Sequence, residues 1–212
     1  MERSFADVED RITEHVETYR ESAPFYPVEA EAIGSLSDAF RAGEYGNRDV
    51  EWVVRWYFRR AVTDIDHEER RAVEAAVSDV EPEALRGAMW DAIDALDDEF
   101  SDPPHHGALD ALTGIPGVDI EIAAALLWFL SPDEYFVVGE REWAVVAAVT
   151  DGAHLEADLD DTYPESMTVD AYDRYLDVVR QIAERLDIDH WRLYMVIRSV
   201  YADATEPDGY AD

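Results

Sequence analysis

Apolar residues recur at helical spacing along most of this chain, and that pattern constrains the fold more than any other feature. Between Tyr172 and Leu186, for example, the apolar positions lie three or four residues apart, as they do on one face of a helix. Strand patterns are rare. The apolar run at residues 136–138 is the one short β-like stretch, and it is too isolated to form a sheet. The pattern predicts an all-α fold.

Helix start and stop signals divide the pattern into segments. Ser4 and Asn47 are suited to cap helices, Gly43 to end one, and Pro82 to stand in a first turn. Loops are expected where prolines, glycines or acids cluster, at residues 22–27, 100–107 and 151–164. The expected helices cover about residues 5–19, 29–42, 48–60, 66–78, 82–97, 108–112, 120–130, 140–149, 168–186 and 188–202.

Acidic residues far outnumber basic ones, 50 to 17, which gives a formal net charge of −33. Every basic residue is arginine, and the acids are spread along the chain. This composition resembles that of proteins from halophiles that accumulate salt. At molar salt the Debye length is about 3 Å, so charge repulsion is largely screened. The charge would oppose a nucleic-acid partner strongly in ordinary buffer, but only weakly under those conditions.

Composition also excludes several kinds of chemistry. The chain has no cysteine, which removes disulfides, thiolate metal sites and cysteine nucleophiles. It has no lysine, so no Schiff base forms on a lysine side chain. No segment approaches the roughly 18 apolar residues of a membrane span, and acids follow Met1 where a signal peptide would be basic and apolar. We therefore expect a cytoplasmic protein with no membrane partner and no cofactor.

A glycine-containing turn joins two of the expected helices. Residues 114–127 read GIPGVDIEIAAALL, and such a turn can present backbone N–H groups to a phosphate. However, Asp119 stands at the N-cap of the second helix, where its carboxylate accepts hydrogen bonds from the same N–H groups, and Glu121 adds a second negative charge. The turn is therefore either a nucleic-acid grip or a capped joint between two helices. As a grip it would use the backbone of Gly114, Ile115, Gly117 and Val118.

Residues 109–149 resemble the helix-hairpin-helix–GPD superfamily, the base-excision DNA glycosylases. The hairpin and its following helix match LTGIPGVDIEIAAALLWFL, and the segment that holds the family's catalytic aspartate matches YFVVGEREWAVV. The closing region, YDRYLDVVRQIAERLDIDHWRLY, is similar to an uncharacterised branch related to that superfamily. The resemblance implies one domain of two helical lobes over residues 1–204, with the hairpin at about 108–130 and a frayed tail at 205–212.

The departures from the family pattern bear on catalysis. The family's catalytic aspartate aligns with Gly139, which has no side chain to activate water. The lysine of the bifunctional members aligns with Glu121, and the second hairpin glycine aligns with Asp119. Glu140 follows the aspartate position, but one helical step turns a side chain by about 100°, so it replaces the aspartate only if the loop shifts. The resemblance therefore implies a member without the family's chemistry.

The expected helix at residues 48–60 combines tryptophan with arginine. Trp52 and Trp56 share one face, and Arg55, Arg59 and Arg60 lie around another. In a nucleic-acid-binding protein these side chains would stack a base and hold phosphates. Alternatively, the tryptophans belong to the core and the arginines pair with neighbouring acids, because aromatic residues at helical spacing are usually buried. Four arginines spread over two helices are the candidates for a second basic patch: Arg180, Arg185, Arg192 and Arg198.

A metal site has little support in the sequence. His105 and His106, with Asp102, are the best candidates, but adjacent histidines in a loop usually point apart, so we expect no metal. Three hypotheses remain. The first is a non-catalytic or repurposed glycosylase-like protein that binds nucleic acid. The second is a protein-interaction or structural module whose phosphate site is capped by Asp119. The third is a glycosylase with Glu140 as a displaced acid.

Overall fold

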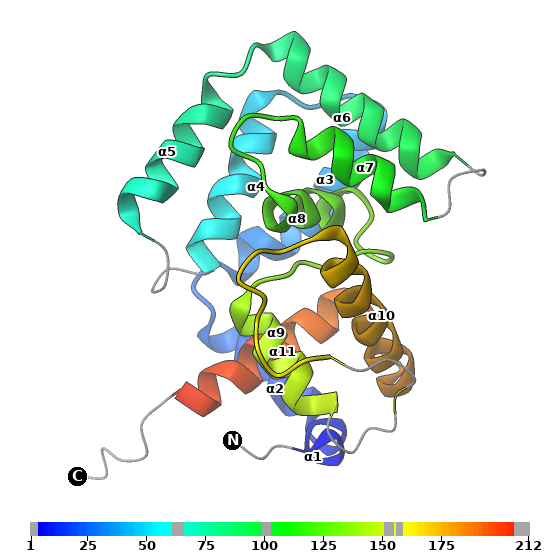
Figure 1. Cartoon of the computed structure of the whole chain (residues 1–212). Helices are drawn as coiled ribbons and strands as arrows, with labels where there is room; N and C mark the ends of the chain where they lie inside the picture. Colours follow the sequence, from blue (N-terminus) through cyan, green and yellow to red (C-terminus); the bar gives the residue numbers. More distant parts are fainter. Residues whose placement is uncertain (1–3, 61–65, 99–102, 151–154, 156–158, 206–212) are drawn as a thin grey trace.

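The computed structural model describes residues 4–60, 66–98, 103–150, 155 and 159–205 (Figure 1). Within these residues the chain forms eleven α-helices and no strand, which confirms the predicted all-α class. The helices are α1 (Phe5–Asp10), α2 (Ile12–Ser22), α3 (Tyr26–Ala42), α4 (Asn47–Arg60), α5 (His67–Ser78), α6 (Pro82–Asp97), α7 (Pro104–Thr113), α8 (Ile120–Leu130), α9 (Glu140–Thr150), α10 (Val169–Leu186) and α11 (His190–Thr205).

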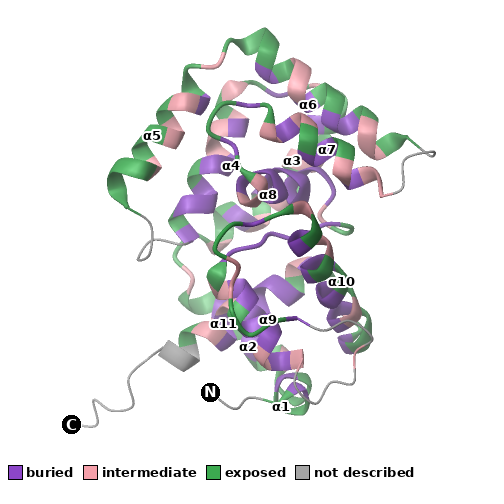
Figure 2. Ribbon diagram, viewed as in Figure 1, coloured by how far each residue is buried: buried purple, intermediate pink, exposed green. Residues whose placement is uncertain are grey.

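The helices pack in two lobes. Helices α3 to α8 form one lobe, in which α8 is the central helix and packs against α3, α4 and α7. Helices α1, α2, α9, α10 and α11 form the other, where α11 packs against α2 and α9 (Figure 1). Buried residues face the interior of both lobes, and one apolar core continues from one lobe into the other (Figure 2). Residues 122–130 of α8 are all buried, as expected of a helix that is apolar on every side.

Several predicted boundaries are wrong. Helix α2 ends at Ser22 and α3 begins at Tyr26, so the loop expected at residues 22–27 is shorter than predicted. Two further differences have a local reason. The first expected helix is divided at Arg11, whose φ of −119° and ψ of 15° separate α1 from α2. Helix α7 begins at Pro104, four residues earlier than predicted, because proline in a first turn has no N–H to leave unbonded. As a result, His105 and His106 lie on a helix, where the sequence predicted a loop.

A buried extended segment, residues 135–139, passes between the lobes. It has no strand partner among the described residues, and side chains donate hydrogen bonds to several of its carbonyl oxygens. Tyr172 and Tyr175 of α10 donate their hydroxyls to carbonyl oxygens of the segment at 2.9 and 3.1 Å, and Arg60 of α4 donates to another at 2.7 Å. The β-like run of the sequence is therefore a single extended chain held by side chains of both lobes.

Candidate functional site

The hairpin between α7 and α8 is a capped turn. Asp119 is the N-cap of α8, and its carboxylate accepts a hydrogen bond from the Ile122 N–H at 2.9 Å, as the sequence predicted. Gly117 has a φ of +86°, a conformation that favours glycine. Of the four residues proposed as a grip, Gly114 and Gly117 are exposed, whereas Ile115 and Val118 are buried. The start of α8 therefore already has an anionic partner of its own.

A second carboxylate faces the same helix end. Glu121 accepts a hydrogen bond from the Tyr163 hydroxyl, and burial raises the pKa of this carboxyl. Asp119 and Glu121 together place negative charge where a phosphate would approach. Helix α5 also lies close to the turn, because a Cβ added to Gly117 would lie 3.1 Å from the Cβ of Ala76.

Replacing Asp119 with alanine is expected to lower the free energy of unfolding by about 1 kcal/mol, through loss of the N-cap hydrogen bond. Denaturant unfolding in molar KCl measures this difference. Asp110→Ala is the matched control, because Asp110 is exposed on α7 and caps no helix. A loss no larger than that of the control would contradict the capping role.

The space beside Gly139 is filled by an ion pair. A Cβ added to Gly139 would lie 2.8 Å from Oε2 of Glu142 and 3.1 Å from Nη2 of Arg60. No side chain fits there unless these groups move. Glu140, the proposed displaced acid, is exposed at the first residue of α9 and does not line the pocket between the lobes.

Three charged side chains form a buried network beside Gly139. Arg60 Nη1 lies 2.6 Å from Glu142 Oε2, and Arg198 Nη1 lies 3.3 Å from Glu142 Oε1. Burial alone would raise the pKa of Glu142, but the two guanidinium groups outweigh burial and lower it. The prediction that Arg60 belongs to a surface patch of arginines must be corrected. Arg60 is 6% exposed and pairs with Glu142 inside the protein.

Two other arginines of α4, Arg55 and Arg59, differ in their surroundings. Arg55 is exposed but pairs with Glu51 at 3.0 Å and approaches Glu74 at 3.9 Å. Arg59 is also exposed; it forms no ion pair within the described residues, and its guanidinium lies 5.7 Å from the ring centroid of Phe25. Arg59 is therefore a cation of α4 that remains available to an anionic ligand.

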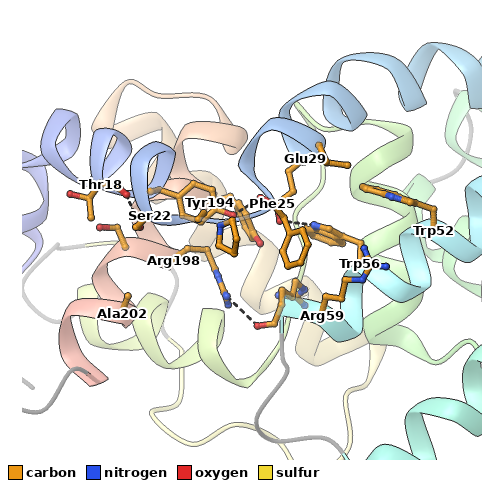
Figure 3. A pocket seen from close by; sticks show the side chains of 16 residues that line it. Thr18, Ser22, Phe25, Glu29, Trp52, Trp56, Arg59, Tyr194, Arg198 and Ala202 are labelled. Atoms are coloured by element: carbon orange, nitrogen blue, oxygen red, sulfur yellow. Dashed lines mark hydrogen bonds between the residues drawn. The ribbon is translucent and has the colours of Figure 1, made fainter.

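A pocket of about 360 Å³ lies where α2, the start of α3, α4 and α11 meet, between the two lobes (Figure 3). Figure 3 shows Trp52 and Trp56 at one end and Thr18 and Ser22 at the other. Arginine and aromatic side chains dominate its wall. The aromatic residues are Tyr19, Phe25, Trp52, Trp56 and Tyr194, and the charged residues are Glu29, Arg59, Arg60 and Arg198.

A buried carboxylate lies in the pocket wall. Glu29 is 5% exposed and accepts hydrogen bonds from the Tyr19 hydroxyl at 2.5 Å and from the Trp56 indole N–H at 2.8 Å. No arginine among the described residues forms an ion pair with it. Since a carboxylate has about four acceptor positions, Glu29 retains capacity for a ligand that donates N–H groups.

Two exposed apolar side chains lie at the mouth of the pocket. Phe25 and Val28, 47% and 48% exposed, are two of the three exposed large hydrophobic residues in the described part of the chain. Deeper in the wall, the hydroxyl of Tyr194 is buried and has no hydrogen-bond partner within that part. Exposed apolar side chains around a cavity are typical of a binding site.

The sequence identified part of this pocket. Of the predicted base-stacking and phosphate-binding group, four members lie in the pocket wall and one, Arg55, does not; the four are Trp52, Trp56, Arg59 and Arg60. The sequence did not identify Glu29, since nothing in the pattern separates this acid from the other acids of α3. The second arginine patch does not form as a unit, because Arg198 joins the pocket while other members lie elsewhere.

The two neighbouring histidines also differ from the prediction. Both side chains contact Asp173 of α10, so they converge where the sequence predicted divergence. Asp102, their predicted partner, lies outside the described residues.

Comparisons with protein-family models, with curated proteins and with solved structures found no match. None of the described helices is both long enough and apolar enough to cross a membrane.

Proposed function

We propose that this protein is a non-catalytic nucleic-acid-binding protein that takes one unstacked base into the pocket between its lobes. The observation that carries the proposal is the pocket itself, which combines aromatic walls, a buried acceptor and a cation at the mouth. Its volume of about 360 Å³ lies within the range of ligand sites, roughly 300–1,000 Å³.

The aromatic walls favour a flat, unsaturated ring. Stacking of a base on an aromatic side chain contributes about 1–3 kcal/mol and tolerates different bases, because every base has a π-face. Trp52 is only partly buried, so its ring is accessible to a ligand, whereas Trp56 is 3% exposed and forms the deeper wall. A base removed from its stack would regain on these rings part of the stacking energy it lost.

The polar groups match the other parts of a nucleotide. Beside its bonds from Tyr19 and Trp56, the Glu29 carboxylate has acceptor positions for a ligand whose edge carries N–H donors. Nucleobases have such edges. Arg59, exposed beside Phe25 at the mouth, is placed to contact the phosphate next to an inserted base. The hairpin contributes little in this proposal, because Asp119 and Glu121 occupy or shield the start of α8.

The proposal excludes base excision as the activity. Gly139 has no side chain, Glu142 is held as an anion between two arginines, and Glu140 is exposed away from the pocket lining. A catalytic acid or base must reach the substrate, and neither Glu140 nor Glu142 lines the pocket. The net charge of −33 opposes contact with many phosphates at once. It therefore favours a short contact at one nucleotide over a long contact with a duplex.

The apolar side chains at the mouth support a second candidate, a protein-interaction module. Phe25 and Val28 expose a surface on which an aromatic or aliphatic side chain of a partner protein would pack, with its end inside the pocket. The capped hairpin agrees with this alternative as well. The two candidates differ in their ligand, so one set of titrations separates them.

Fluorescence anisotropy of labelled oligonucleotides, titrated with the protein across a series of KCl concentrations, tests the proposal. We expect saturable binding to single strands and to duplexes with a bulged base, and much weaker binding to intact duplex. Trp52→Ala and Arg59→Ala are expected to weaken binding by about tenfold or more, the equivalent of about 1.4 kcal/mol. Circular dichroism at each salt concentration checks that the protein stays folded.

The chain offers a matched control for each variant. Trp90→Ala removes an exposed tryptophan on α6, and Arg55→Ala removes an arginine of α4 that already has acidic partners. Both are expected to bind like the parent protein. Asp119→Gly is also expected to leave affinity unchanged. Binding that appears only in Asp119→Gly would place the contact at the hairpin, and absence of binding to every oligonucleotide would favour the protein-partner candidate.

A further inference from the structure

A cluster of two histidines and one aspartate joins the lobes away from the pocket. His105 and His106 lie in the first turn of α7, and Asp173 lies in the first half of α10. The Nε2 atom of His105 lies 2.7 Å from Oδ1 of Asp173, and the Nε2 atom of His106 lies 2.7 Å from Oδ2. Each ring thus faces a different oxygen of one carboxylate.

The arrangement follows from where α7 begins. Because α7 starts at Pro104, both histidines lie at its end, where no preceding turn blocks their side chains. The two rings stand 4.9 Å apart between centroids, with an interplanar angle of 82°, so their Nε2 atoms reach the same place from different directions. Asp173 approaches from the other lobe. Three potential ligand atoms therefore converge from two helices.

We propose that His105, His106 and Asp173 bind a divalent transition-metal ion of the zinc type. One ligand atom from each residue lies within 4.8 Å of the others, close enough for all three to contact one ion after a small adjustment. Two imidazole nitrogens and one carboxylate oxygen are a ligand set typical of zinc and related metals. Within the described residues this is the one such group of three.

The donor types separate this site from the acidic surface. Carboxylates alone attract calcium and magnesium, which prefer oxygen ligands, and the chain has 50 acidic residues. Imidazole nitrogen instead favours zinc, cobalt and similar ions. Selective binding of such an ion is therefore a property of the cluster and not of the general negative charge.

Burial differs among the three ligands. The His105 side chain is 6% exposed and fixed, whereas those of His106 and Asp173 are 39% and 29% exposed. Solvent therefore has access to one side of the cluster, where water would complete the coordination of an ion held by three protein ligands. An ion there would also tie α7 of one lobe to α10 of the other, and so raise the stability of the whole fold as its concentration rises.

The test uses the whole chain of 212 residues, treated with a chelator and then titrated in molar KCl. Calorimetry with Zn²⁺ and visible absorption with Co²⁺ report binding directly, and we expect saturation at one ion per chain. His106→Gln and Asp173→Asn are each expected to weaken binding by about 100-fold or more, since even outer-shell changes weaken metal sites by about 10- to 100-fold. His67→Gln, which removes an exposed histidine of α5, is expected to bind like the parent.

Two results would overturn the metal site. One is the absence of saturable Zn²⁺ or Co²⁺ binding to the folded parent protein. The other is unchanged affinity in both His106→Gln and Asp173→Asn. Because His106 and Asp173 are partly exposed, these variants are expected to keep the fold, which circular dichroism checks. If one of them unfolds, the other still decides between the outcomes. The result is independent of the pocket, because none of the three ligands lines it.

Discussion

Replacing Glu142 with glutamine is expected to lower the free energy of unfolding by about 3–5 kcal/mol, the largest effect we expect from one conservative change. The variant keeps the size of the side chain but removes its charge. Arg60, 6% exposed, would then remain buried without its anion, and Arg198 would lose a partner at 3.3 Å. Removing one member of a buried ion pair is strongly destabilising because the other charge stays desolvated.

Denaturant unfolding in molar KCl measures the difference, and the pH dependence identifies its source. The arginines hold the pKa of Glu142 below its ordinary value, so its contribution to stability is present above the ordinary glutamate pKa of about 4.3 and is lost as pH falls through the lowered pKa. The parent protein and Glu142→Gln should therefore differ most near neutral pH and converge in acid. Glu140→Gln, exposed on the same helix, is the control. A loss below about 1 kcal/mol would contradict the buried network.

Introducing aspartate at Gly139, the position that the glycosylase resemblance aligns with a catalytic aspartate, is expected to destabilise the protein by about 3 kcal/mol or more and to produce no base excision. The new Cβ would lie 2.8 Å from Oε2 of Glu142, and the new carboxylate would place a second anion beside it. Crowding in a packed interior and repulsion between buried like charges both oppose the folded state.

Unfolding of Gly139→Asp, together with incubation of the folded variant with damaged duplexes, tests this expectation. Gly34→Asp is the matched control, since nothing lies within 4 Å of a Cβ added at Gly34 on α3. A Gly139→Asp variant as stable as the parent protein would show that the position has room for a side chain. Excision of a base by that variant would show that the fold retains a catalytic cleft, and the expectation of no base excision by Gly139→Asp would be wrong.

The helical pattern predicted the architecture well because burial repeats at helical spacing in a chain of packed helices. The boundaries that failed depend on weaker signals. Pro104 reads equally well as part of a loop and as the first turn of a helix, and only packing against the rest of the lobe decides between them. The break at Arg11 has no helix-breaking residue, so the pattern continued across it.

The features of the sites that the sequence did not predict depend on contacts between residues that are far apart in the chain. His105 and its partner Asp173 are 68 residues apart, and the pattern within α7 contains no information about α10. Glu29 and Glu31 both belong to α3, yet one is buried in the pocket wall and the other is exposed. Arg59 and Arg60 are neighbours, and only their position relative to the second lobe separates a surface cation from a buried one. Trp52 and Trp56 were predictable because helical spacing alone places them on one face.

The most direct test of the proposed pocket is nuclear magnetic resonance of the protein with a short unlabelled single-stranded oligonucleotide, added stepwise in molar KCl. We predict that the indole signals of Trp52 and Trp56 and the ring signals of Phe25 shift and saturate together, with intermolecular Overhauser contacts to base protons. Signals from the hairpin residues Gly114 and Gly117 should remain unchanged. Shifts centred on those hairpin residues, with the pocket signals unaffected, would contradict the proposal that the base enters between the lobes.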